Sequence, residues 1–340
     1  MQKNREIGIV FPSELEKSAK DDTVEYYHPK YEDISNIDNL YEGYMSARKG
    51  KRNRKAIYLF ENNLFEELIK LSNELKDGTY KPSKYRTFDI YEPKKRTIVA
   101  PAFRDSVVQH TIYMLVYDVF DRGFIHDSYG CRKGKGTHKA SGRLQTFMRK
   151  HSSEEYYLQM DIQKYYYSIN HEILRNSIER KIKDNNLVDL IMKFVNIKDK
   201  IGLYIGSLLS QLFGLIYMDR VDHYIKRVLK QKHYVRYVDD FIIVGISYDK
   251  AKELLDIIQK YIKKELNLTL SKFHIAKIKK GANYVGYRTW KAKKFVRKRT
   301  LYHFNKYLKK GNMEAVNSVL GHAKHSSSLK YMKKQIKGKI

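Results

Sequence analysis

Apolar residues recur at helical spacing in the first third of the chain. One such series is Leu64, Leu68, Leu71 and Leu75. The pair Asp77-Gly78 follows it and is typical of a helix end. Between residues 81 and 101 the pattern alternates and is interrupted by prolines, which predicts short strands and turns. A second helix is predicted over 107–120, and the Gly- and Lys-rich segment 129–137 is predicted to be a loop.

The centre of the chain has the pattern of a sheet. Four runs rich in aromatic and β-branched residues are predicted as strands: 156–161, 234–238, 241–244 and about 268–275. Only Asp239-Asp240 separates the second run from the third, which is the spacing of a tight hairpin. The first run ends on a carboxylate, Asp161.

Helices are predicted around these strands. One is capped by Asn170 and carries Leu174, Ile178 and Ile182, one covers about 207–230, and one carries Leu254, Leu255, Ile258 and Ile262. The order along the chain is strand, helix, helix, hairpin, helix, strand. This order favours an antiparallel sheet covered by helices on one face, and therefore the α+β class.

The charge of the chain is strongly basic and unevenly distributed. Its 340 residues include 67 Lys and Arg against 38 Asp and Glu, which gives a formal net charge of +29. The stretch 266–340 contains 20 Lys and Arg and one acidic residue, Glu314. Because binding a phosphate backbone releases condensed counterions, this excess indicates a nucleic-acid partner. A ribosomal-type protein has a similar composition, so charge alone does not decide the function.

Other features narrow the class of protein. A single cysteine, Cys131, excludes intramolecular disulfides and cysteine-cluster zinc sites, fits a reducing cytoplasm, and is more typical of a small core residue than of a nucleophile. His171-Glu172 begins like a zinc-binding helix, but Arg175 occupies the position of the second histidine. The first twelve residues lack a signal-peptide core, and the most apolar stretch, 203–218, is too short to span a bilayer. We expect a cytoplasmic protein without membrane attachment.

The carboxylates provide the candidate chemistry. Adjacent acids such as Asp239 and Asp240 repel one another unless cations neutralise them. If neighbouring strands bring Asp161 alongside, the three form an oxygen-only site for two Mg²⁺ ions, for which Mn²⁺ can substitute. An isolated Asp-Asp pair is more often an ordinary solvated turn.

Two motifs decide between these interpretations. Tyr237-Val238-Asp239-Asp240, preceded along the chain by Asp161-Ile-Gln-Lys-Tyr-Tyr-Tyr-Ser-Ile169, resembles the catalytic motifs of reverse transcriptases. The resemblance covers about residues 80–325 and implies that the three aspartates are catalytic. It also implies a right-hand polymerase fold, with an antiparallel palm sheet backed by helices. The expected division is an N-terminal extension (1–55), fingers (56–155 with part of 180–205), palm (156–287) and basic thumb (288–340).

The resemblance assigns a further set of residues to the incoming nucleotide: Lys95, Arg96, Ile162, Tyr166, Ile205, Gly206, Gln211 and Lys272. In the segment Pro93–Arg96, Lys and Arg would hold the triphosphate, although such a run alone is usually a solvated face. Tyr166 matches the steric gate that excludes a ribose 2′-hydroxyl, whereas Tyr165 and Tyr167 are expected in the core. Lys272 stands where the family often places a lysine near the pyrophosphate.

A last set is assigned to the template and primer: Arg132, Lys133, Tyr284, Gly286, Lys293, Lys294 and Arg297. The segment 129–134 resembles the fingers loop beside the template, and its glycine spacing is not that of a P-loop. Residues 283–287 resemble the primer grip, and the basic segment 291–310 would grip the duplex backbone.

One segment points to a subgroup. Ile205-Gly206, followed by Ser210-Gln211, resembles diversity-generating retroelement reverse transcriptases, whereas retroviral and group II intron enzymes generally carry Gln-Gly and Ser-Pro. An apolar Ile205 cannot hydrogen-bond the nucleotide, which lowers discrimination. The resemblance implies an enzyme that is error-prone at template adenines. Its implied partners are template RNA, the RNA/DNA duplex, deoxynucleotides and a small basic accessory variability protein that forms a helical oligomer.

Two alternatives stay open. A retron or phage-defence reverse transcriptase shares the same polymerase motifs. A catalytically inactive RNA-binding protein on a polymerase fold is a hypothesis of another class, which the three intact aspartates disfavour. A group II intron protein is disfavoured because the chain ends at Ile340, without room for the maturase and endonuclease regions.

Overall fold

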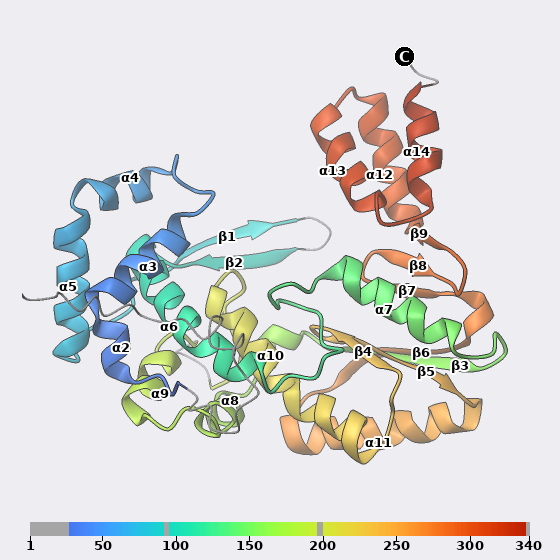
Figure 1. Cartoon of the computed structure of the whole chain (residues 1–340), viewed down its shortest axis with the longest axis horizontal. Coiled ribbons are helices and arrows are strands. Elements are labelled where there is room, and N and C mark those ends of the chain that lie inside the picture. The colour runs from blue at the N-terminus through green and yellow to red at the C-terminus, as the bar shows by residue number, and fades with distance from the viewer. Residues whose placement is uncertain (1–26, 92–94, 196–199, 338–340) are drawn as a thin grey trace, which may run out of the picture. The chain divides into compact units, whose positions relative to one another are not determined.

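The computed structural model describes residues 27–91, 95–195 and 200–337. The chain divides into two contact units, each with its own helices and strands (Figure 1). The first comprises Met1–Gly123, Arg175–Ile197 and Ile205–Leu209, and the second comprises Phe124–Leu174, Lys198–Tyr204 and Ser210–Ile340.

The first unit combines a helical core with a two-stranded hairpin. Its elements are α2 (Tyr31–Ser35), α3 (Ile37–Arg48), α4 (Lys55–Asn62), α5 (Leu64–Lys76), β1 (Arg86–Ile90), β2 (Arg96–Ala100), α6 (Phe103–Asp121) and α9 (Asn185–Met192). Helix α3 packs tightly on α6 at Gly43. A Cβ at this position would lie 2.0 Å from the Thr111 hydroxyl, so only glycine allows this close approach. Strands β1 and β2 pair antiparallel, and most of their side chains are exposed.

The second unit is built on a four-stranded antiparallel sheet with the order β4-β5-β3-β6. Its strands are β3 (Tyr156–Ile162), β4 (Tyr234–Tyr237), β5 (Asp240–Ile246) and β6 (Leu270–Lys277). Helix α7 (Thr137–Arg149) covers one face, where Leu144 and Phe147 pack with Tyr157 and Ile242. Helix α11 (Tyr248–Leu266) lies on the opposite face (Figure 1).

Besides α9, two helices and a π-helical segment lie between β3 and β4 along the chain. They are α8 (His171–Glu179), which begins in the second unit and ends in the first, α10 (Leu208–His223), which begins at the end of the first, and the π-helical segment η3 (Tyr224–Val228). Short 3-10 turns follow β3 (η2, Tyr165–Tyr167) and β6 (η4, Ile278–Lys280).

A smaller sheet and a helical module complete the second unit. The sheet has the order β7-β8-β9, with strands β7 (Ala282–Tyr284), β8 (Tyr287–Thr289) and β9 (Lys294–Val296). The helices are α12 (Lys298–Lys309), α13 (Met313–Ala323) and α14 (Ser328–Lys337). Tyr287, Phe304, Val316 and Met332 form a separate hydrophobic cluster that joins this module to the small sheet.

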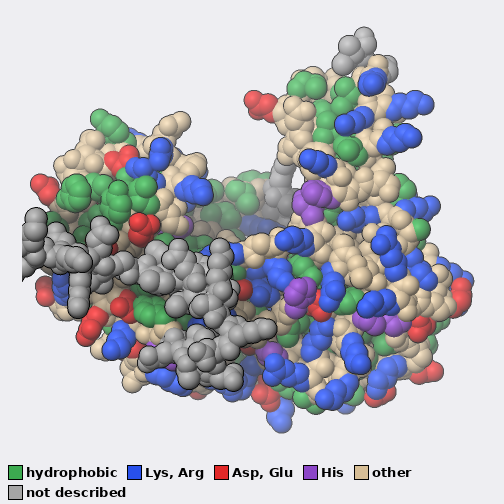
Figure 2. Space-filling model, in the orientation of Figure 1, with side chains coloured by type: hydrophobic (Ala, Val, Ile, Leu, Met, Phe, Trp, Pro, Cys, Tyr) green, Lys and Arg blue, Asp and Glu red, His purple; other side chains and the backbone are tan. Residues whose placement is uncertain are grey.

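The surface carries the charge expected from the composition. In Figure 2, Lys and Arg side chains are spread over the second unit, including its helical module, with few acidic side chains between them. On the first unit, exposed apolar side chains gather on α4 and α5, among them Tyr58, Leu59 and Phe65. Among the described residues, no helix combines the length and apolarity needed to cross a bilayer.

Several predicted elements are confirmed. The α+β class and the antiparallel sheet are present, helix α5 ends at Lys76 with Asp77 as its C-cap, and the Asn170 side chain accepts a hydrogen bond from the Ile173 amide at 3.1 Å. The helix predicted over 207–230 runs as α10 and changes to a π-helical segment at Tyr224.

Two expectations about the sheet are corrected. The hairpin loop is Val238-Asp239 rather than Asp239-Asp240, because Asp240 already pairs with Tyr237 and with Asp161 inside the ladder. Helices cover both faces of the sheet rather than one. The cause is α7, whose apolar residues Leu144 and Phe147 form a stripe at helical spacing that the sequence analysis did not use.

Candidate active site

The carboxylates meet at one end of the four-stranded sheet. Asp161 lies near the end of β3 and Asp240 begins β5, and the two are direct partners in the antiparallel register. Directly opposed residues have Cβ atoms about 5 Å apart and point to the same face. Asp239 precedes Asp240 in the hairpin loop, and its backbone carbonyl accepts a hydrogen bond from the Ile162 amide at 3.3 Å. Asp161 and Asp240, which are 79 positions apart along the chain, are therefore neighbours, as predicted.

Asp240 lies in an environment that disfavours its charge. The pKa of its carboxyl is raised to about 7, chiefly by burial and also by the carboxylates of Asp161 and Asp239, while a hydrogen bond from Gln159 opposes the increase. Arg297 also opposes the increase through its positive charge. The raised pKa shows that this position disfavours a further negative charge.

The two strand carboxylates have different polar partners. An Asp161 oxygen accepts a hydrogen bond from the Ser271 hydroxyl at 2.8 Å and lies 3.8 Å from the Lys272 ammonium. Lys272 is also the register partner of Asp161 on β6, so the sequence-predicted lysine reaches the carboxylates. Asp240 accepts a hydrogen bond from the Gln159 amide at 2.8 Å.

The hairpin loop has a strained backbone, and a buried hydrogen-bond network fixes its position. Val238 has a φ of 57°, which is rare for a β-branched residue. Its carbonyl accepts a hydrogen bond at 2.8 Å from Arg236, whose fully buried guanidinium also forms a fork with Asp222 of α10 at 2.7 and 2.5 Å. The Tyr234 hydroxyl donates to the same carboxylate at 2.6 Å. This buried network fixes the loop that presents Asp239 and Asp240.

The free edge of β4 is covered by the segment Ile125–Gly130. The Arg236 amide donates to the Asp127 carbonyl at 3.0 Å, and the Tyr129 amide donates to the Arg236 carbonyl at 2.9 Å. Gly130 lies against the hairpin loop, because a Cβ there would be 2.5 Å from a Val238 methyl group.

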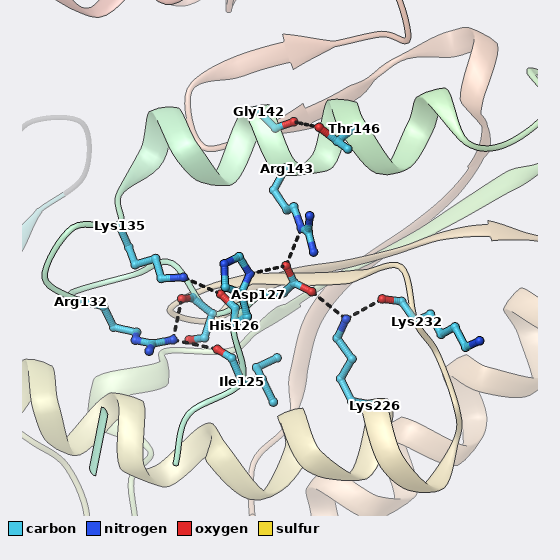
Figure 3. Close-up of polar contacts among 11 residues, drawn as sticks. Ile125, His126, Asp127, Arg132, Lys135, Gly142, Arg143, Thr146, Lys226 and Lys232 are labelled. Atoms are coloured by element: carbon cyan, nitrogen blue, oxygen red, sulfur yellow. Dashed lines mark hydrogen bonds and ion pairs between the residues drawn. The ribbon is translucent and has the colours of Figure 1, made fainter. Parts of the chain in front are cut away.

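Asp127 ties this segment to the helices around it (Figure 3). Its buried carboxylate accepts hydrogen bonds from Arg143 of α7 at 2.7 Å and from Lys226 of η3 at 2.8 Å. Arg132, predicted to contact the template, donates from its guanidinium to the carbonyls of Ile125 and Ser128. Its template role stays a prediction beside this contact within the chain.

Tyr166 lies close to the carboxylates. Its side chain hydrogen-bonds to Cys131, and burial raises the pKa of its hydroxyl, with contributions from Cys131 and Asp239. Gly214 of α10 makes room for this ring, since a Cβ there would lie 3.3 Å from both Tyr165 and Tyr166. Tyr165 is buried as expected, whereas Tyr167 is half exposed.

Four residues predicted to hold the nucleotide belong to the first unit. Lys95 and Arg96 are exposed at the start of β2, with Lys95 3.0 Å from Asp89; Pro93 and Lys94 lie outside the described residues. The Val99 amide donates to the Ile205 carbonyl at 2.8 Å, which attaches the Ile205-Gly206 segment to β2. At Gly206, φ is 116° and a Cβ would lie 2.8 Å from Ile98, so this position requires glycine.

The other predicted contacts differ in exposure. Gln211 is exposed on α10, whereas Ile162 is buried, so only its backbone faces the site. Tyr284 is also fully buried, so a role at the primer would depend on the hairpin backbone rather than on its ring. Gly286 occupies the β7–β8 turn with a φ of 89°. The remaining predicted contacts are cations at or near the surface: Lys133, Lys293, Lys294 and Arg297.

The donor set fits a divalent metal site. Carboxylate oxygens are the ligands that Mg²⁺ prefers, and a cation would relieve the repulsion that helps to raise the pKa of Asp240. In the described parts of the chain, no three His, Cys, Asp or Glu side chains already surround a point suited to a metal ion. The hydrogen bonds from Ser271 to Asp161 and from Gln159 to Asp240 each use one oxygen of the carboxylate, so they orient the two groups without occupying both oxygens of either.

The residues that support the aspartates carry no sequence motif and were not predicted. Gln159, Arg236 and Asp222 each contact the hairpin or a carboxylate and were not assigned a role. Arg236 had a detectable signal, since it is a charged residue inside an otherwise apolar strand. Gln159 had one as well, because it lies two residues before Asp161 and therefore on the same face.

This register of carboxylates on an antiparallel sheet defines a right-hand polymerase fold. The sequence matches the family described as reverse transcriptase (RNA-dependent DNA polymerase) over residues 81–289, well over half of the chain. The chain belongs to this family.

The chain is also similar to several known proteins. The group II intron-encoded protein LtrA of Lactococcus lactis subsp. cremoris is 27% identical over 233 residues, 64% of this chain and 38% of that protein. Protein YkfC of Escherichia coli K12 is 24% identical over 313 residues, 77% of each chain. Telomerase from Candida albicans, solved with a fragment of telomeric RNA, gives a TM-score of 0.48 at 12% identity, covering 77% of this chain and 59% of that one. The chain thus spans well under half of LtrA, and the subgroup stays a prediction.

Proposed function

We propose that the chain is an RNA-directed DNA polymerase that copies template RNA into complementary DNA. The observation that supports this most directly is the direct register pairing of Asp161 with Asp240, beside Asp239 in the hairpin loop, within the segment that matches the family. The excess of Lys and Arg over acidic residues suits a nucleic-acid duplex.

The chemistry follows from the residues in place. Asp161, Asp239 and Asp240 would hold two Mg²⁺ ions, which when bound activate the primer 3′-hydroxyl and neutralise the departing pyrophosphate. Tyr166 would exclude a ribose 2′-hydroxyl. Lys272 lies beside Asp161 and can carry charge or a proton near the leaving group.

The domain names of the family would divide the chain at other positions than the boundaries of the two contact units. Residues 56–155, with part of 180–205, would be the fingers, in which Lys95 and Arg96 bind the triphosphate. Residues 156–287 would be the palm and 288–340 the thumb, with Lys293, Lys294 and Arg297 on the duplex backbone. Arg132, Lys133 and the hairpin carrying Tyr284 and Gly286 would hold template and primer.

The finer proposal is an error-prone enzyme of a diversity-generating retroelement. Its support is the Ile205-Gly206 segment, where an apolar side chain replaces one able to hydrogen-bond the nucleotide. Such an enzyme would misincorporate chiefly at template adenines and work with a small basic accessory protein.

Primer extension tests the activity. Purified protein with an RNA template, a DNA primer and Mg²⁺ should give product, and Asp239→Asn should abolish it while RNA binding is retained. Asp256→Asn is the matched control, because Asp256 is an exposed aspartate on α11 paired with Lys260. Unchanged product in Asp239→Asn would exclude this site.

Sequencing the product tests the subgroup. We expect errors concentrated at template adenines, and Ile205→Gln should reduce them by restoring a polar contact. Uniform fidelity across the four template bases would contradict the diversity-generating proposal and favour a retron or phage-defence enzyme.

A further inference from the structure

The side chain of Gln159 on β3 makes two hydrogen bonds that link a candidate metal ligand, Asp240, to the neighbouring strand β7. Its amide nitrogen lies 2.8 Å from an Asp240 carboxylate oxygen and 3.0 Å from the backbone carbonyl of Asn283 in β7. Both partners are pure acceptors, so the amide must present its nitrogen and use both hydrogens.

The pleat of the sheet explains this placement. Gln159 lies two residues before Asp161, so both side chains point to the same face. Its register partner on β5 is Ile242, which makes Asp240 a diagonal neighbour within reach of a long side chain. On this face the strand β7 passes close enough for a second bond.

The Asn283 end of this link belongs to the hairpin that resembles the primer grip. Strand β7 pairs with β8 through Tyr284 and Tyr287, and the turn between them contains Val285 and Gly286 at positive φ. One planar amide therefore spans the distance between a candidate metal ligand and the hairpin proposed to hold the primer end.

We propose that Gln159 is a positioning residue that fixes the Asp240 carboxylate relative to the β7–β8 hairpin. The inference rests on the proposed polymerase function and deepens it. Metal ions held by Asp240 and a primer end held by the hairpin must stay in register to within a fraction of an ångström for the hydroxyl to attack. Gln159 supplies that register through two short hydrogen bonds.

The hairpin does not depend on Gln159 for its attachment. The Tyr157 hydroxyl donates to the Gly281 carbonyl at 3.2 Å, and the rings of Tyr157 and Tyr284 belong to one buried cluster. Replacing Gln159 should consequently leave the fold in place and release only the Asp240 carboxylate.

Gln159→Met tests the proposal, because Met keeps the length of the side chain and removes both donors. Gln145→Met is the matched control: the Gln145 amide also donates to a backbone carbonyl, that of Trp290 at 2.9 Å, but it contacts no carboxylate. The readouts are thermal unfolding, Mn²⁺ binding followed by electron paramagnetic resonance without substrate, and steady-state primer extension.

We expect Gln159→Met to bind Mn²⁺ about 10- to 100-fold more weakly and to lower kcat by a similar factor, as partners of metal ligands typically do. The KM for primer–template should change less than about twofold, and saturating Mn²⁺ should restore part of kcat. Gln145→Met should match the wild type in all three readouts. Wild-type metal affinity and kcat in Gln159→Met would overturn the inference.

Two further outcomes keep the test decisive. If Gln159→Met unfolds at a lower temperature than the control, Gln159→Leu, of similar volume, repeats the comparison, and equal metal binding in this folded variant counts against the proposal. If the wild type makes no product, the polymerase function fails, while the Mn²⁺ comparison still decides whether Gln159 positions Asp240.

Discussion

The two faces of the β4–β5 hairpin differ in how their carboxylates are paired. On the face toward α10, Asp222 is fully buried and accepts hydrogen bonds from Tyr234 and from both sides of the Arg236 fork. On the other face, Asp161 and Asp240 stand directly opposite one another. The first carboxylate is neutralised within the chain, whereas the second pair increases the negative charge of its own surroundings.

The difference separates support from function. A buried ion pair with every acceptor used needs nothing from outside and can hold a strained loop such as Val238. Carboxylates that raise one another's pKa, as at Asp240, store an unfavourable charge that a bound cation relieves. We call the face with Asp222 and Arg236 the closed side of the hairpin, and the face with Asp161 and Asp240 the open side.

The largest expected effect comes from the open side. Asp240→Asn should lower the primer-extension rate by about 1,000-fold or more, because several kcal/mol of charge stabilisation depends on the metal ligand. Its melting temperature in metal-free buffer should stay equal to that of the wild type or rise, since a like charge is removed. A clear loss of stability in Asp240→Asn would contradict the distinction between the two faces.

The closed side should respond in the reverse order. Arg236→Met leaves Asp222 buried without its cation and should destabilise the fold by about 3–5 kcal/mol, measured by urea unfolding. The double variant Asp222→Leu/Arg236→Met removes both charges and should recover much of that loss. Equal stability of Arg236→Met and the wild type would show that the pair does not support the hairpin.

The sequence predicted the open side better than the closed one. Asp161, Asp239 and Asp240 carry a motif, and strand order alone was enough to expect them together. In the structure, the register of β3 and β5 places two of them on the same face. Motif and periodicity are local signals, so they can be recognised in the sequence alone.

The supporting contacts could not be read in the same way. The pairing of Asp222 with Arg236 depends on how α10 lies beneath β4, and the two bonds of Gln159 depend on where β7 crosses the sheet. The one-residue shift of the hairpin has a similar cause, since pairing with Asp161 draws Asp240 into the ladder. Tertiary packing decides these features, and no local pattern encodes it.

A smaller effect tests how tightly the segment Ile125–Gly130 packs against the hairpin loop. Gly130→Ala places a Cβ 2.5 Å from a Val238 methyl group and 2.7 Å from the Val238 amide nitrogen, and backbone cannot easily give way. We expect a loss of about 1–3 kcal/mol in the free energy of unfolding. Gly142→Ala is the matched control, because nothing lies within 4 Å of its Cβ on α7 and helix propensity should stabilise it by roughly 0.5–1 kcal/mol. Equal effects of the two substitutions would argue against close contact at the loop.

The smallest effect concerns Asp127, which holds the outer edge of β4. Burial alone would raise the pKa of its carboxyl, but hydrogen bonds from Arg143 and Lys226 lower it below the ordinary value. A lowered folded-state pKa means that the carboxylate stabilises the fold fully above the unfolded pKa of about 4 and stops doing so as pH falls through the folded value.

Asp127→Asn should therefore cost about 1 kcal/mol at pH 6, since Arg143 is partly exposed and the amide keeps one acceptor. The difference from the wild type should shrink as the pH falls below the unfolded pKa of about 4 and through the lowered folded-state pKa, where the wild-type carboxylate takes up its proton. Urea unfolding at pH 6, 4 and 3 measures this directly. A difference that stays constant over that range would mean that shape rather than charge holds the segment, and that only Arg236 and Asp222 support the hairpin electrostatically.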